Sequence, residues 1–154
     1  IIKKKKKGVK GMYVKQISVF LENSTGTLAE LTQLLGEKGI DLIALSIADT
    51  EHYGILRAIV SDTDKAVSEL KNAGYTVKLT DVLAVSVPDK PGGLSVVLEA
   101  LAEENIGVNY VYSFVRSSGS HALVIFRVTD LEAAERLFRA HNVTLLTQEQ
   151  VREL

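Results

Sequence analysis

Hydrophobic and polar residues follow the same order of patterns twice along this chain. Residues 13–22 alternate between apolar and polar, which is typical of a half-buried strand. Leu28, Leu31 and Leu35 then place an apolar stripe on one face of a helix, and Gly39 is suited to end it. The first series continues with strands at 40–48 and 54–61, a helix capped by Asp62 or Thr63, and a closing strand at 75–79.

The second series repeats this order after a shift of 66 positions, so that Asn23 to Leu28 corresponds to Asp89 to Leu94. Further along, the shift becomes 68, because Asp62 corresponds to Asp130, and we place the two extra residues around 117–120. A repeat of this length matches a small domain built twice. The predicted elements are strands at 82–87, 106–115, 121–128 and 143–146, a helix through Leu94 and Leu101, and a helix capped by Asp130.

Each series reads as strand, helix, strand, strand, helix, strand, which predicts an α+β fold of two ferredoxin-like βαββαβ units in tandem. Right-handed crossovers place both helices on one face of an antiparallel four-stranded sheet. We divide the chain into units at 12–79 and 80–154. The link at Thr80 and Asp81 is too short for a flexible tether, so we expect the units side by side, joined by sheet edges rather than faces.

Three aromatic residues of the predicted strand 106–115 alternate with aliphatic ones. Tyr110, Tyr112 and Phe114 have the same parity as Ile106 and Val108, which predicts one shared core face.

Residues 1–11 stand apart because they contain six lysines and no acidic residue before Met12. We interpret them as a leader rather than folded structure; a natural basic arm is the alternative. The rest of the chain has 12 basic and 19 acidic residues, a net charge of −7, which disfavours a nucleic-acid partner. No segment has the apolar length of a membrane span, and we expect a cytoplasmic protein without membrane contact.

The chain has no cysteine, which excludes disulfides and thiolate metal sites. His52, His121 and His141 lack ligand spacing, so we expect no metal and no cofactor. Neither strand-to-helix turn contains the arginine that a hydrolase of this fold would use on a phosphate. We therefore expect no enzyme activity, with a small ferredoxin-like enzyme as the remaining catalytic alternative.

The turns from first strand to first helix concentrate special residues in both series. A helix start presents unpaired backbone N–H groups that can receive a carboxylate, and glycine lets a ligand approach the backbone. Asn23 and Asp89 add acceptors for an ammonium group, so together these groups describe a free amino acid. Ordinary turns and caps use the same residue types, and that structural interpretation stays open.

These turns resemble those of the ACT domain, a small regulatory module of amino-acid metabolism. The segment 21–28 is similar to the serine-responsive version in phosphoglycerate dehydrogenase, and 88–94 fits the general ACT pattern. The segments 39–42 and 105–109 resemble the start of its second strand, and the resemblance extends from Met12 to about Thr147.

By that resemblance, a ligand binds between paired domains, held by the turn of one and the second strand of its neighbour. The resemblance assigns these ligand-binding residues: Asn23, Thr25, Gly26, Thr27, Leu28, Asp41, Ile43, Asp89, Gly92, Gly93, Leu94, Gly107 and Asn109. The first turn has Thr25 where proline is usual, and the second strand has Gly107 where a polar residue is frequent.

The resemblance implies a stand-alone regulatory module that binds a small amino acid, forms a homodimer, and signals in trans to a partner enzyme. Two alternatives remain beside it. One is a ligand-free dimerisation scaffold, and the other is the small enzyme named above.

Overall fold

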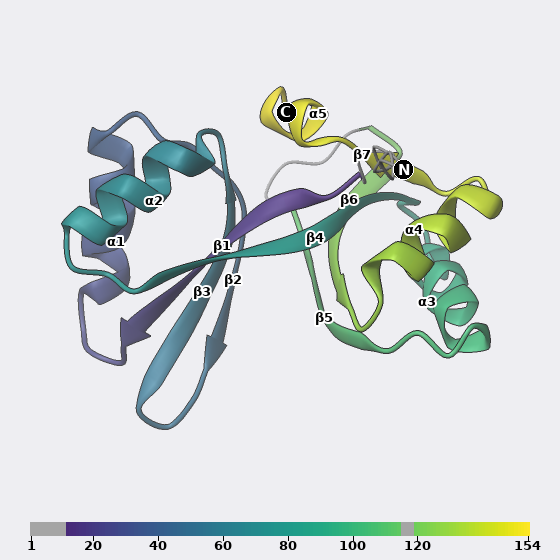
Figure 1. Ribbon diagram of the computed structural model, residues 1–154, viewed down its shortest axis with the longest axis horizontal. Coiled ribbons are helices and arrows are strands. Elements are labelled where there is room, and N and C mark those ends of the chain that lie inside the picture. The colour runs from purple at the N-terminus through teal and green to yellow at the C-terminus, as the bar shows by residue number, and fades with distance from the viewer. Residues whose placement is uncertain (1–11, 115–118) are drawn as a thin grey trace, which may run out of the picture.

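The computed structural model describes residues 12–114 and 119–154 (Figure 1). Residues 1–11 lie outside these ranges, as does part of the insertion placed near 117–120 and the end of the strand predicted at 106–115. The first unit contains β1 (Val14–Glu22), α1 (Thr27–Glu37), β2 (Leu42–Asp49), β3 (Tyr53–Val60) and α2 (Thr63–Asn72). The second contains α3 (Gly93–Glu103), β5 (Val108–Ser113), β6 (His121–Val128), α4 (Leu131–Ala140), β7 (Thr144–Leu146) and α5 (Gln148–Arg152). Between them runs β4 (Val77–Pro88).

Strand order confirms the predicted fold. Hydrogen bonds connect the strands in the order β2-β3-β1-β4-β6-β5, and β7 also pairs with β4. All pairings are antiparallel. Each unit thus has its last, first, third and second strands in that order, which is the ferredoxin-like arrangement.

The predicted link between the units is part of a strand. β4 is continuous over 12 residues and contains Thr80 and Asp81, which pair with Gln16 and Lys15 of β1. Its first half closes the sheet of the first unit, and its second half opens that of the second unit through β6 and β7. The boundary at 79/80 therefore falls inside a shared strand, which fixes the units relative to each other.

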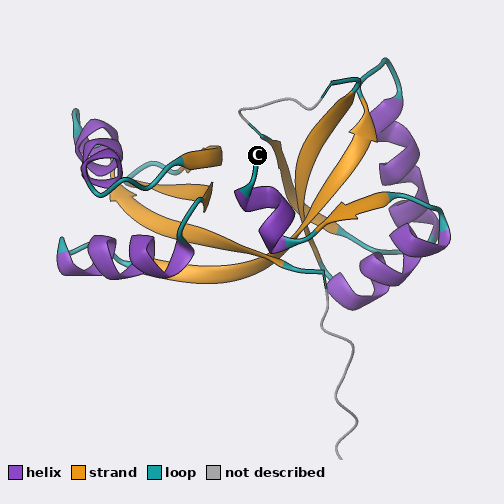
Figure 2. Cartoon of the chain, turned by 90° about the horizontal axis from the view of Figure 1, so that it is seen from above, coloured by secondary structure: helices purple, strands orange, loops and turns teal. Residues whose placement is uncertain are grey.

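Three apolar clusters form the interior. One lies between the first sheet and α1 and α2, and one between the second sheet and α3 and α4. The third, which we call the seam, joins the helix-free faces of the two sheets. Figures 1 and 2 show the helix pairs on opposite outer sides with the strands between them. The seam residues are Val14, Ile43, Ala44, Ile59, Val82, Ala84, Phe114, Leu123, Ile125 and Val151.

The expected joining by edges is therefore incomplete. Hydrogen bonding does run through β4, but the sheet also curls until β2 and β5 meet at a bridge between Ala44 and Phe114. A flat sheet would leave the apolar seam side chains in water, which explains why the faces close on each other.

A register shift occurs at the same place in both units, between Leu42 and Ala44 in β2 and between Val108 and Tyr110 in β5. Such a shift moves the following side chains to the other face of the strand. Ile106 therefore packs in the second core, whereas Phe114 packs in the seam. The three aromatic residues share a face, as predicted, but that face lies on the seam. The prediction that they share it with Ile106 was wrong, because parity does not survive this bulge.

The short helix α5 was not predicted. Thr147 caps it and exchanges hydrogen bonds with Gln150 in a capping box, and Val151 is fully buried in the seam. The spacing of Thr147 and Gln150 was the signal available in the sequence.

Candidate functional site

The four long helices begin in two different ways. α2 and α4 start at Asp62 and Asp130, whose carboxylates accept from the backbone N–H groups of Lys65 (3.1 Å) and Ala133 (2.9 Å). α1 and α3 instead start at glycines with left-handed φ, 95° at Gly26 and 82° at Gly92, and no side chain caps them. Glycine adopts this conformation without steric cost. In both turns the first helical N–H donates to a turn carbonyl, from Thr27 to Ser24 (3.4 Å) and from Gly93 to Lys90 (2.9 Å). The N–H groups that follow have no side-chain cap and are the ones that solvent or a ligand could use.

The first turn is fastened to the β2–β3 hairpin through Asn23. Its side-chain amide donates to Asp49 Oδ1 (2.7 Å) and to the carbonyl of Thr50 (2.8 Å). With both amide hydrogens used, Asn23 offers its oxygen, which lies near Gly54, as an acceptor. Within the turn, the hydroxyls of Ser24 and Thr27 lie 2.7 Å apart.

A shallow cavity of about 310 Å³ connects this turn with the second strand of the same unit. Asn23, Thr27 and Leu28 line it together with Ile47 of β2. A larger cavity of about 490 Å³ also borders this turn. Thr25, Thr27, Glu22 and Glu30 line it, together with residues 73–76, which precede β4. Gly26 lies between the two cavities and lines neither.

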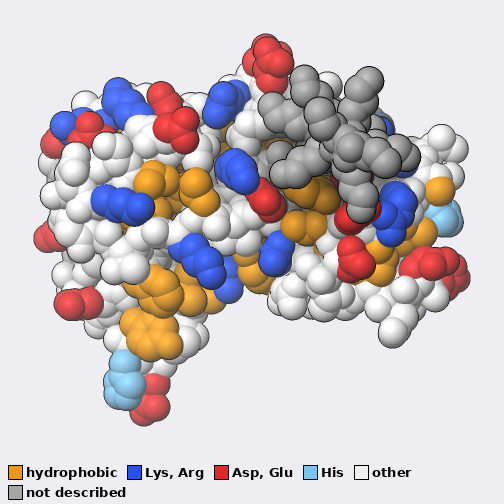
Figure 3. Space-filling view, viewed as in Figure 1, with side chains coloured by type: hydrophobic (Ala, Val, Ile, Leu, Met, Phe, Trp, Pro, Cys, Tyr) orange, Lys and Arg blue, Asp and Glu red, His pale blue; other side chains and the backbone are white. Residues whose placement is uncertain are grey.

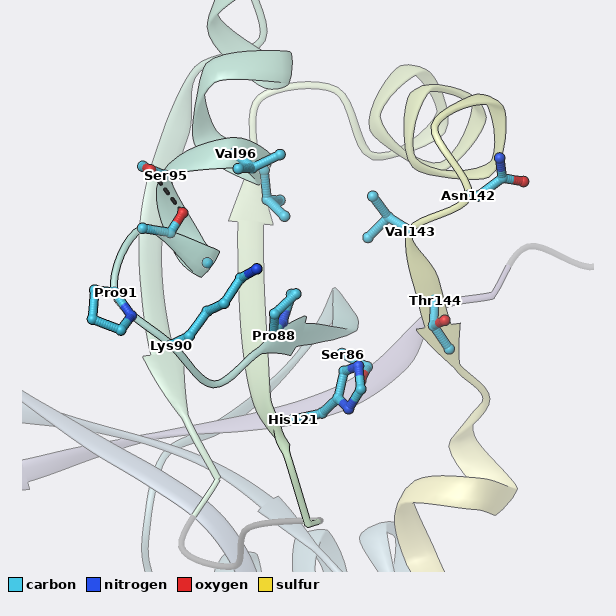
Figure 4. A pocket seen from close by; sticks show the side chains of 13 residues that line it. Ser86, Pro88, Lys90, Pro91, Ser95, Val96, His121, Asn142, Val143 and Thr144 are labelled. Carbon is cyan, nitrogen blue, oxygen red and sulfur yellow. Dashed lines mark hydrogen bonds between the residues drawn. The ribbon is translucent and has the colours of Figure 1, made fainter.

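The second turn borders a cavity of about 600 Å³ (Figure 4). Gly92 and Gly93 belong to its wall, whereas Asp89 and Leu94 do not. Gly93 is tightly confined, since a Cβ added there would lie 2.0 Å from the carbonyl oxygen of Pro88. The backbone N–H of Asp89 donates to the carbonyl of Ser120 (2.9 Å), which fastens this turn to the start of β6.

The second-strand candidates lie away from these cavities. Asp41 and Gly107 occupy equivalent positions, where their N–H groups donate to the hydroxyls of Ser61 (2.9 Å) and Thr129 (3.0 Å). Ile43 is only 2 % exposed and packs in the seam.

Asn109 is exposed on β5 and lines none of the cavities described above. Within one chain, the structure thus brings Asn23, Thr27 and Leu28 together and keeps the four second-strand residues apart from both turns.

Sequence reasoning missed several residues that line these cavities. Lys90, His121 and Thr144 border the second cavity, and Ile47 borders the shallow one. Lys90 was inside the quoted turn and could have been found by comparing charges between the repeats, because Ser24 is its counterpart. His121 and Thr144 come from β6 and β7, and only the fold brings them to the turn.

The seam contains a buried polar cluster beside its apolar residues. Gln16 is fully buried, accepts from the hydroxyl of Tyr112 (2.8 Å), and donates to the hydroxyl oxygen of Tyr110 (2.8 Å). The Arg57 guanidinium lies 3.9 Å above the ring centre of Tyr110. Burial, and secondarily Tyr110, raises the pKa of Tyr112, while Arg57 acts in the opposite direction. The cluster ties β1 and β3 of one unit to β5 of the other.

Within residues 12–114 and 119–154, no group of three or more His, Cys, Asp or Glu side chains is placed to hold a metal ion. In the same described part of the chain, every helix is too short or too polar to cross a membrane.

Comparison with known proteins gives a consistent result. The sequence pattern of the ACT domain pair matches residues 12–154. A search of curated proteins found no match. The crystal structure of protein BT0572 from Bacteroides thetaiotaomicron is similar, with 38% identity, a TM-score of 0.87, and coverage of 94% of this chain and 99% of that one.

Two more distant structures share the fold. The ligand-free regulatory subunit of aspartate kinase from Thermus thermophilus has 19% identity and a TM-score of 0.62, over 85% of this chain and 93% of that one. The corresponding subunit from Thermus flavus has 20% identity and a TM-score of 0.59, over 86% and 97%. The strand order, the duplicated glycine turns and the match over residues 12–154 together place this chain in the ACT domain pair family.

Proposed function

We propose that this protein is a regulatory module that binds a small amino acid at its glycine turns and signals binding to a partner enzyme in trans. It has no catalytic role of its own in this proposal. The single observation that carries it is the contrast between helix starts. Both second helices are capped by aspartate, whereas both first helices begin at an uncapped left-handed glycine.

An amino acid matches the groups at the first turn. The open helix start favours a carboxylate, because its N–H groups and partial positive charge point outward. The acceptor oxygen of Asn23 suits the ammonium group, and its orientation is fixed by the two bonds that the amide makes to the hairpin. Leu28 and Ile47 supply an apolar surface for a small side chain.

A second copy of the chain completes the site in this proposal. The shallow cavity opens at β2, an edge strand on which Leu45 and Ile47 are 37 % and 45 % exposed. Figure 3 shows hydrophobic side chains gathered over the part of the first unit where the β2–β3 hairpin projects. Exposed apolar edge strands favour pairing with another chain. A homodimer formed there would bring second-strand residues of one copy to the turn of the other.

The regulatory role rests on family and fold. Two structures that share the fold are regulatory subunits of aspartate kinase from Thermus thermophilus and Thermus flavus. For the present chain, a ligand that prefers one packing of the dimer would shift its equilibrium and so alter a bound partner.

The test is a thermal-unfolding screen against the twenty amino acids. A ligand at 100 times its dissociation constant should raise the free energy of unfolding by about 2.7 kcal/mol. Asn23→Ala should abolish the shift at the first turn, and Asp89→Ala any shift at the second. Asn72→Ala, at the end of α2, is the matched control and should leave the shift intact.

A ligand-free dimerisation scaffold is the competing function, and the same exposed edge strand favours it. Sedimentation of the protein with and without the best ligand separates the two. A dimer whose stability is the same with every amino acid, together with a flat unfolding screen, would establish the scaffold and overturn the sensor.

A further inference from the structure

The two larger cavities occupy equivalent places in the two units. Each lies between the start of the first helix, the beginning of the third strand, and the approach to the last strand. We call them the first-unit cavity (about 490 Å³) and the second-unit cavity (about 600 Å³). Their corresponding wall positions are 20 and 86, 22 and 88, 24 and 90, 25 and 91, 27 and 93, 30 and 96, 53 and 121, 74 and 142, 75 and 143, and 76 and 144.

The walls of these two cavities carry opposite charge. Glu22 and Glu30 line the first-unit cavity, and no lysine, arginine or histidine does. At the same two positions the second-unit cavity has Pro88 and Val96. It contains Lys90 and His121 instead, and no acidic residue lies in its wall.

Lys90 is directed into this space. Figure 4 shows its side chain reaching toward Pro88 and Val96, with Val143 and Thr144 across the opening and Asn142 turned outward at the rim. No salt bridge engages Lys90 among the described residues. Two other wall residues bond to each other, since the Ser95 hydroxyl donates to the Gly92 carbonyl (2.8 Å).

From the contrast between the two cavity walls, we propose that the second-unit cavity is a site for a small organic anion, a carboxylate with a short apolar body. Lys90 neutralises the carboxylate, and His121 and Thr144 supply further hydrogen-bonding groups. Pro88, Val96 and Val143 contact the apolar body. The wall contains no carboxylate that could pair with an ammonium group, so an amine should not bind there.

This site shares Gly92 and Gly93 with the second glycine turn of the proposed function, but it lies away from the predicted second-strand residues. Its wall contains His121 of β6 and residues 142–144 at the start of β7. It contains neither Asn109 of β5 nor Gly107, which precedes that strand. Asn23 belongs to the other unit. The anion site therefore rests on the second turn of the proposed function, whereas amino-acid binding at the first turn can succeed or fail without it.

Titration calorimetry with three matched probes tests the site. The probes are 3-methylbutanoate, L-valine, which adds the amino group, and 2-methylpropylamine, which lacks the carboxylate. We expect saturable binding of 3-methylbutanoate and no binding of the amine. Valine is measured in a variant with Asn23→Ala and Asp89→Ala, which removes binding of its amino group at the turns, and should bind more weakly than 3-methylbutanoate. Binding of the amine as strongly as the carboxylate would overturn the proposal.

Two substitutions in the cavity wall locate the binding. Lys90→Gln should weaken 3-methylbutanoate binding about tenfold or more, as expected for loss of a charged hydrogen bond. Val96→Glu introduces the acidic residue of the first unit on an exposed helix position and should abolish binding without unfolding the chain. Lys78→Gln, on an exposed position of β4, is the matched control and should bind as the unaltered protein does.

The proposal is wrong if 3-methylbutanoate does not bind, or if its affinity is the same in Lys90→Gln, Val96→Glu and Lys78→Gln. Neither result would affect the part of the amino-acid screen that reports on the first turn, because that signal depends on Asn23. Conversely, a flat amino-acid screen with Lys90-dependent anion binding would remove the proposed function and keep this site.

Discussion

The first unit begins its leading helix with Gly26 and Thr27, and the second with Gly92 and Gly93. Both helices start from the same left-handed glycine, but the next residue sits in very different surroundings. Thr27 uses its hydroxyl to contact Ser24, whereas Gly93 lies so close to the Pro88 carbonyl that a side chain would collide with it. Duplication has thus kept the path of the backbone while changing what each turn accepts.

The faces that meet in the seam differ in the same manner. The first unit contributes Gln16 and Arg57, and the equivalent positions of the second unit are Val82 and Ile125. The second unit instead contributes polar groups from its edge strand, Tyr110 and Tyr112. Because the two halves complement each other, neither face could be exchanged for a second copy of itself.

The largest effect is expected at the second turn. Gly93→Ala should lower the free energy of unfolding by about 3 kcal/mol, because the new Cβ would force the helix start away from β4. Thr27→Ala at the equivalent position should cost less than about 1 kcal/mol. Urea unfolding measures both, and equal costs would show that the two turns do not differ in confinement.

A pH effect of intermediate size is expected from the seam. Burial raises the pKa of Tyr112 above its value of about 10 in an unfolded chain. The stability that this provides is complete below pH 10 and is lost above it, because the unfolded chain then releases the tyrosine proton while the folded one retains it. Each pH unit above 10 should remove up to about 1.4 kcal/mol through this residue.

Denaturant titrations between pH 8 and 11 test this account with Tyr112→Phe. The variant should be less stable at pH 8, because the buried side-chain oxygen of Gln16 loses the hydrogen bond that the Tyr112 hydroxyl donates to it. Its stability should fall less steeply above pH 10. Tyr53→Phe, an exposed tyrosine, is the control. A slope unchanged by Tyr112→Phe would contradict the assignment.

The smallest effect concerns the ends of the helices. The first unit ends α1 and α2 with Gly39 and Gly74, while the second unit has Asn105 and Asn142 at the same positions, with φ of 56° and 55°. Asparagine tolerates this conformation less well than glycine. Asn105→Gly should therefore stabilise the protein by about 0.5 kcal/mol, and Gly39→Asn should cost a similar amount. Opposite signs in urea unfolding are expected; a loss in both variants would refute the argument.

The repeated pattern was sufficient to predict the fold and both turns, because alternation, helical stripes and glycines are local signals. It could not predict the seam. Whether Phe114 faces the core or the other unit depends on a bulge in β5, and no particular residue type marks that bulge in the sequence. Thr80 likewise carries no signal that distinguishes a link between units from a strand. The candidate residues Asn23 and Gly92 could be chosen because turn signals are local, and whether they bind a ligand stays a prediction. His121 and Thr144 could not be chosen, because only folding brings them to a turn far away in sequence.

Backbone amide resonances offer the most direct test of amino-acid binding at the glycine turns. The amides of Gly26 and Gly92 should move in a saturable way on titration with the amino acid that stabilises the protein, while those of Gln16 and Leu70, in the seam and the first core, remain in place. Saturable shifts confined to the interior, or no shift at either glycine with any amino acid, would contradict the account.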